Sequence, residues 1–225
     1  MLESLFNTLV VVGLALQLLV LHELIQGAYK KYPLLLVYSL ALLATTVAEA
    51  TRFFIGGVND TGLKKWYWIN DNILRVLLFF IVIFFVYRAL EGYAHRATVV
   101  RGLALGALLI LGVSLFIAWD PIGLRFRQSG LRRTSANLDF AAALLAMALW
   151  TALLRQPRKD WQLLQLTAGV GLEVSVEAIA HSIRSIVHAD SVFATGSNLL
   201  AVVTHLLGLY IWWRALRMPP AKVGA

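Results

Sequence analysis

The amino-acid sequence predicts an all-α protein, a polytopic integral membrane bundle of seven transmembrane helices. The chain has 225 residues, of which 60% are hydrophobic and 14% charged, and its mean hydropathy is +0.75. A soluble domain of this length does not need so much apolar surface, so the bilayer is its natural solvent. The connections between apolar segments are too short to hold a soluble domain, so residues 1–225 form one seven-helix domain.

Hydropathy places seven helices of spanning length along the chain. They are 5–27, 33–55, 67–90, 98–119, 136–155, 161–187 and 192–214. The first is expected to be a retained helix, because no basic segment precedes it and no small-x-small cleavage site follows it. The longest connection, 120–137, contains Pro121, two glycines and four arginines, which favours a loop or a short interfacial helix.

The basic residues of the connections predict the orientation. Eleven lie on one side of the predicted bundle, and they are Lys30, Lys31, Arg88, Arg96, Arg101, Arg155, Arg158, Lys159, Arg214, Arg217 and Lys222. Six lie on the other side, and they are Lys64, Lys65, Arg125, Arg127, Arg132 and Arg133. Because cytoplasmic loops carry the excess of Lys and Arg, the N-terminus is predicted outside and the C-terminus inside. A bacterial inner (cytoplasmic) membrane is the expected location.

One stripe of polar residues interrupts the sixth helix. The segment LEVSVEAIAHSIR places Glu173, Glu177, His181 and Arg184 within an arc of roughly 80° at helical spacing. Each ionised group near the bilayer centre costs about 2.5–3.5 kcal/mol on insertion scales. The stripe is therefore predicted to face protein, water or a ligand, and we expect it to line a polar cavity open to the outer side.

Other ionisable or strongly polar residues fall at the same predicted depth. They are Glu49 and Arg52 in the second helix, Asp71, Asn72 and Arg75 in the third, and Asp139 in the fifth. Two interpretations of the combined set are open. The first is a structural ion-pair network that joins helices, since pairing offsets much of the desolvation cost. The second is a ligand-binding cavity, which the number and one-sided placement of the charges favour.

Two cofactor alternatives also remain open. Glu173, Glu177 and His181 at i, i+4 and i+8 present groups that suit Zn, Mn or Fe, although the Glu-x-x-His spacing of di-iron bundles and the H-E-x-x-H motif are missing. His22 and His205, from the first and seventh helices, are candidates for axial ligation of a haem b. The alternative for both histidines is a hydrogen bond between helices.

Several functional classes are excluded or disfavoured. The chain contains no cysteine, which removes disulfides, thiolate metal sites and thiol catalysis. All six lysines fall outside the predicted helices, so no Schiff-base lysine is available and no retinal is expected. The net charge of +8 lies in connections between apolar segments, so it indicates membrane orientation and not nucleic-acid binding.

Part of the chain resembles a family of small bacterial membrane proteins. The stretches YPLLLVYSLALLATTV and KKWYWINDNILRVLLFFIVIFFVYRAL are similar to those of uncharacterised seven-helix proteins of soil bacteria such as Acidobacteria. The resemblance covers the second and third predicted helices, and its most specific part is Tyr-Trp followed by Asn and an acid. It implies seven helices and a bacterial inner membrane, and it assigns no activity or site residue.

The sequence therefore predicts a non-enzymatic bacterial membrane protein. It is expected to be a binding or scaffold subunit of a larger membrane complex, or a sensor that depends on a partner, with a polar cavity in its outer half. Its expected partners are membrane lipids and other membrane protein subunits. The alternative is a haem- or metal-containing redox subunit, or a membrane enzyme in which Glu177 and His181 provide the chemistry.

Overall fold

A computed structural model describes residues 2–56, 61–120, 125–126, 128–156, 160–186 and 192–218. These residues form seven α-helices, and their bounds are α1 Leu2–Ile25, α2 Pro33–Gly56, α3 Thr61–Ala89, α4 Arg96–Ala118, α5 Gln128–Arg155, α6 Trp161–Ile186 and α7 Val192–Leu216. A 3-10 turn, η1, spans Ala28–Lys30. Two two-residue strands, β1 Trp119–Asp120 and β2 Arg125–Phe126, pair antiparallel between α4 and α5. The prediction of an all-helical fold is confirmed.

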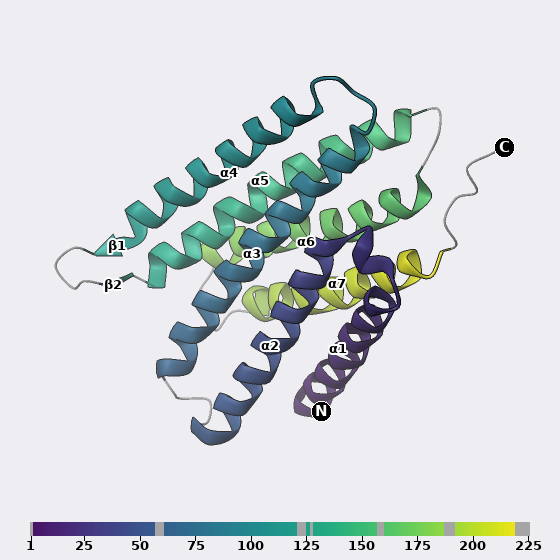
Figure 1. The fold of residues 1–225 in the computed structure, drawn as a ribbon. Helices are drawn as coiled ribbons and strands as arrows, with labels where there is room; N and C mark the ends of the chain where they lie inside the picture. The colour runs from purple at the N-terminus through teal and green to yellow at the C-terminus, as the bar shows by residue number, and fades with distance from the viewer. Residues whose placement is uncertain are drawn as a thin grey trace.

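Consecutive helices run in opposite directions along the bundle (Figure 1). α6 lies between α5 and α7, α3 packs on α2, α4 and α5, and α1 packs on α2 and α7. We call the end of the bundle that carries β1 and β2 the hairpin end. α1, α3, α5 and α7 begin at the hairpin end, and α2, α4 and α6 finish there.

The helices identify a multi-pass membrane protein. Six of them contain segments long and apolar enough to cross a bilayer, and these are Thr8–Ile25, Ile69–Ala89, Arg96–Ala118, Ser129–Arg155, Trp161–Arg184 and Thr195–Leu216. The apolar part of α2 that the structure describes, Pro33–Glu49, is shorter than these segments. Among the described residues, six helices therefore meet the requirement for spanning.

α6 and α7 approach each other closely at Gly169. A Cβ built on Gly169 would lie 2.6 Å from Nε1 of Trp212 and 3.3 Å from the carbonyl oxygen of Gly208. The Trp212 side chain is fully buried, and its indole N–H donates a hydrogen bond to the carbonyl of Leu166 at 3.2 Å. Small residues allow such contact between membrane helices, where packing drives association.

The start of α5 corrects the predicted start of the fifth helix, because part of the connection 120–137 is helical. The helix begins at Gln128, eight residues before the predicted start at 136. A Cβ on Gly130 would lie 2.5 Å from Cα of Ala118, so this glycine lets the first turn of α5 pack directly on α4. Thr134 and Ser135 are fully buried. Gly, Ser and Arg are typical of loops in sequence, but here tertiary contact stabilises them as helix.

The start of α3 corrects a second boundary. The helix begins at Thr61 and not at 67, so Lys64 and Lys65 belong to its first turns and not to a connection. Lysine is a good helix former, and no proline stands in this segment, so the helix continues beyond its apolar part. The apolar segment of α3 starts later, at Ile69.

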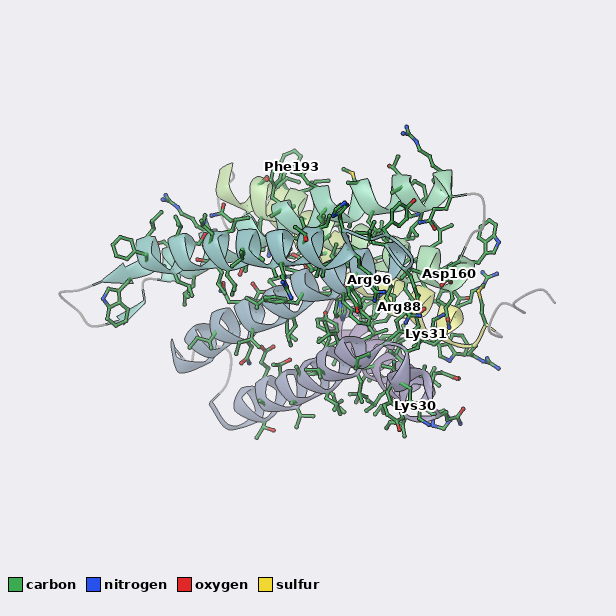
Figure 2. All side chains as sticks on the ribbon, turned by 45° about the horizontal axis from the view of Figure 1, so that its top comes forward. Lys30, Lys31, Arg88, Arg96, Asp160 and Phe193 are labelled. Carbon is green, nitrogen blue, oxygen red and sulfur yellow. The ribbon has the colours of Figure 1, made fainter. Side chains whose placement is uncertain are left out.

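Basic side chains gather at the end of the bundle opposite the hairpin end. Figure 2 labels Lys30, Lys31, Arg88 and Arg96 there together with Asp160. Nζ of Lys31 lies 3.6 Å from Oδ2 of Asp160, and the cations of Lys31 and Arg88 lie 5.2 and 6.0 Å from the centre of the Tyr32 ring. These four basic residues belong to the set that the sequence assigns to the cytoplasmic side.

Candidate functional site

Arg75 joins three helices through carboxylates. Its guanidinium lies 3.2 Å from Oδ1 of Asp71 on α3, 3.4 Å from Oδ1 of Asp139 on α5 and 3.3 Å from Oε1 of Glu177 on α6. The Asp139 side chain is 1% exposed, so its charge depends on these partners. The contact between Arg75 and Glu177 pairs α3 with α6.

A second layer of contacts surrounds Arg75. The Ser135 hydroxyl donates to Oδ2 of Asp71 at 2.6 Å, and Nδ1 of His181 lies 3.2 Å from Oδ2 of Asp139. Arg184 donates from Nη2 to Oε2 of Glu177 at 3.2 Å. We call these side chains the Arg75 network, and its members are Asp71, Arg75, Ser135, Asp139, Glu177, His181 and Arg184. Each carboxylate in it contacts a cation or a histidine.

Glu173 forms a separate cluster nearer the middle of α6. Its Oε1 accepts a hydrogen bond from Nδ1 of His205 on α7 at 2.9 Å, and another from the Tyr38 hydroxyl on α2 at 3.3 Å. Its Oε2 is buried and has no hydrogen-bond partner among the residues that the structure describes. We call Tyr38, Glu173 and His205 the Glu173 cluster. It joins α2, α6 and α7, as the Arg75 network joins α3, α5 and α6.

A cavity of about 310 Å³ lies beside both groups. Five helices contribute to its wall, which is lined by Leu9, Val10, Gly13, Leu14 and Gln17 of α1, Tyr38, Leu42, Thr45, Thr46 and Glu49 of α2, Tyr67, Asp71, Leu74 and Arg75 of α3, Glu173 and Glu177 of α6, and Val202, His205 and Leu206 of α7. The lining residues lie near the middle of α1, α2, α6 and α7 and in the first half of α3, so the cavity occupies the middle of the bundle and extends toward the hairpin end.

The structure brings together most of the residues that the sequence singled out. Glu49, Asp71, Arg75, Glu173 and Glu177 line the cavity. Asn72, Asp139, His181 and Arg184 do not line it. Asn72 donates to the carbonyl of Leu131 at 3.1 Å, and the other three belong to the Arg75 network. Arg52 belongs to α2, but its side chain lies outside the described part of the chain.

Several polar residues of this region were missed by the sequence analysis. Tyr38 and Thr46 of α2 and Gln17 of α1 line the cavity, and Nε2 of Gln17 donates to Oγ1 of Thr46 at 3.4 Å. Gln17 is the one amide in an otherwise apolar stretch of α1, which is a signal of an interhelical contact. Ser135 was missed because it was expected in a loop.

The structure changes the set of residues that could together bind a metal ion. Asp139, Glu177 and His181 offer ligand atoms within 4.8 Å of one another, whereas Glu173 belongs to the other cluster. The Arg75 guanidinium contacts the carboxylates of both Asp139 and Glu177, so a cation there would have to displace it. In the arrangement found here, both carboxylates contact the same guanidinium.

The two histidines proposed for haem do not line a common space. His205 lines the cavity and uses Nδ1 for Glu173, whereas His22 does not line the cavity. Nε2 of His22 lies 2.8 Å from the side-chain amide of Gln26, directly after the end of the same helix. The histidine contacts seen here are therefore hydrogen bonds to neighbouring side chains.

Comparison with known proteins adds no functional assignment. No protein-family model matches the chain, and no curated protein or solved structure is significantly similar to it. The chemistry of the cavity and its two clusters is therefore the basis for a functional proposal.

Proposed function

We propose that this protein is a non-enzymatic, ligand-binding subunit or sensor of a bacterial inner membrane, and that a small molecule binds in the cavity between α1, α2, α3, α6 and α7. The ligand changes the positions of these helices, and a partner membrane subunit responds to the change. The observation that carries the proposal is the cavity of about 310 Å³ with ionisable side chains in its wall. Ligand sites are typically concave and largely apolar, with a few well-placed polar groups.

The mixture of side chains in the wall supports binding over a purely structural role. The Arg75 network ties α3, α5 and α6 together without needing an empty space beside it. Structural ion pairs between membrane helices need only their partners. The carboxylates of Glu49 and Glu173 line the cavity but belong to no ion pair with an arginine or lysine in the described part of the chain.

The alternative of a membrane enzyme with a metal has weaker support. Its candidate ligands, Glu177 and Asp139, already contact Arg75. The catalytic alternative also requires His181 to reach a substrate, and His181 lies behind the cavity wall, against Asp139. A binding role uses the residues that do line the cavity.

We further propose that all seven helices cross the membrane, with the N-terminus outside and the C-terminus inside. The excess of basic residues toward the end opposite the hairpin end, eleven against six in the sequence, supports this orientation. The cavity then opens toward the outer half of the bilayer. Because the chain has no cysteine, Ser4→Cys and Ala221→Cys give a clean test with an impermeant maleimide in intact cells. Labelling at 4 and not at 221 is expected, and the reverse pattern contradicts the orientation.

Filling the cavity tests the binding proposal. Thr45 lines the cavity, whereas Thr51, on the same helix, is exposed, and both hydroxyls bond to backbone carbonyls of α2. In zwitterionic-lipid nanodiscs, amines, alcohols and carboxylates with straight chains of four to eight carbons are screened for a rise in melting temperature, which binding to the native state produces. At least one compound should stabilise the wild type and Thr51→Trp but not Thr45→Trp. If no compound stabilises the wild type, the cavity is not a ligand site of this kind.

A further inference from the structure

The charge of the cavity wall restricts the ligand. Around the cavity and directly behind its wall stand five carboxylates, those of Glu49, Asp71, Asp139, Glu173 and Glu177. The described cations that face them are the guanidinium groups of Arg75 and Arg184, and the two histidines are His181 and His205. The carboxylates outnumber the positive charges even when both histidines are protonated.

Among the side chains that the structure describes, Glu49 is the carboxylate that this balance leaves without a cation. Asp71, Asp139 and Glu177 contact Arg75, and Glu173 contacts His205. Glu49 is half-buried, and its partner among the described side chains is the neutral amide of Asn70, which donates to Oε1 at 3.2 Å. A carboxylate in a low-dielectric site is stabilised most by an opposite charge.

The unsatisfied hydrogen-bonding atoms of the described wall restrict the ligand in the same way as its charge does. In the described part of the chain, two residues that line the cavity have a buried oxygen with no hydrogen-bond partner, Oε1 of Gln17 and Oε2 of Glu173. Both atoms are acceptors. A buried polar atom without a partner costs free energy, so these positions favour a ligand that donates hydrogen bonds.

The part of the wall that α1 and α7 contribute is mostly apolar, and the cavity volume limits the size of the ligand. The apolar residues of these two helices that line the cavity include Leu9, Val10 and Leu14 of α1 and Val202 and Leu206 of α7. A volume of about 310 Å³ equals roughly ten waters of liquid and is at the lower limit of ligand pockets. It suits a compact head group with a short hydrocarbon portion.

From these observations we infer that the ligand is a small organic cation, an ammonium group on a short apolar chain, and that its head pairs with the Glu49 carboxylate. The inference rests on the proposed function, since it names the ligand class for the same cavity. The ammonium donates hydrogen bonds toward the acceptors of the wall, and the hydrocarbon lies against α1 and α7.

A matched series of probes tests this inference in the full chain. Binding of n-hexylamine, n-hexanol and n-hexanoate is measured at pH 7 by calorimetry with the protein in zwitterionic-lipid nanodiscs, and empty nanodiscs are subtracted. We expect hexylamine to bind about tenfold or more tightly than hexanol, and hexanoate to bind most weakly. Glu49→Gln should lower the affinity for hexylamine about tenfold or more and leave that for hexanol unchanged. Glu91→Gln, at an exposed carboxylate in the α3–α4 connection, should change neither.

The outcomes distinguish a failure of this inference from a failure of the proposed function. If none of the three probes binds and the wider screen is also negative, the proposed function fails. If hexanol or hexanoate binds as tightly as hexylamine, the cavity is a ligand site but the cationic class is wrong. An amine preference that persists in Glu49→Gln overturns the role of Glu49. If Glu49→Gln loses hexanol binding as well, Glu49→Asp provides the test. This variant keeps the negative charge, so it must still bind hexylamine more tightly than hexanol.

Discussion

The contact between Gly169 and Trp212 allows a sharp test of the packing between α6 and α7. In Gly169→Ala the new methyl group would lie 2.6 Å from Nε1 and 2.7 Å from Cδ1 of the indole. Carbon contacts are most favourable at about 3.5–4.0 Å, so the ring would have to move by roughly 1 Å. The ring is fully buried, which leaves it no free space for this movement.

The cost of that movement follows from what the indole contacts. Its N–H bond to the carbonyl of Leu166 and its edge-on contact with Tyr38, at a centroid distance of 5.6 Å, would both be disturbed. Overpacking costs typically about 1–3 kcal/mol, and an unsatisfied buried donor about 1–3 kcal/mol. Replacing glycine by alanine in a helix recovers about 1 kcal/mol. A net loss of about 1–5 kcal/mol is therefore expected.

Gly171→Ala is the matched control on the same helix. Its new methyl group would lie 3.5 Å from Cβ of Ala146, an ordinary contact, so this variant should be as stable as the wild type or more stable by up to about 1 kcal/mol. The measurement is unfolding by sodium dodecyl sulfate in mixed micelles, followed by circular dichroism. Equal stability of the two variants would refute the argument. In a Trp212→Phe background the difference between them should shrink, because the smaller ring leaves room for the methyl group.

Three further predictions concern other parts of the bundle. Asp139→Ala should destabilise the protein by about 3–5 kcal/mol, because it leaves the buried Arg75 cation short of a partner. In the same unfolding assay, the double variant with Arg75→Ala should lose less stability than the sum of the two single losses. Gly130→Ala should cost about 1–3 kcal/mol because its Cβ meets the backbone of α4, whereas Gly112→Ala, which faces open space, should not lower the melting temperature. Burial raises the pKa of the Tyr32 hydroxyl above its usual value of about 10, so the stability from its neutral form is present below pH 10 and is lost as the pH rises further. Tyr32→Phe should then flatten the fall in melting temperature above pH 10, and an unchanged slope would contradict this origin.

The sequence by itself determined the class of the fold, because hydropathy acts residue by residue. Apolar segments of spanning length predict membrane helices whatever their neighbours are, and six of the seven helices meet this requirement among the described residues. Helical periodicity placed Glu173, Glu177, His181 and Arg184 on one face of α6. The cost of an ionised group in lipid then predicted that this face meets protein, and Glu173 and His181 are indeed buried.

Only the tertiary structure decided which of these groups meet. Periodicity gives a face but not a partner, so it could not separate Glu177, which joins the Arg75 network, from Glu173, which pairs with His205 and Tyr38. It also could not extend α5 to Gln128, because the close contact of Gly130 with Ala118 stabilises that turn. Partner choice and cavity shape depend on how five helices are placed against one another, and side chains far apart in the sequence set that placement together.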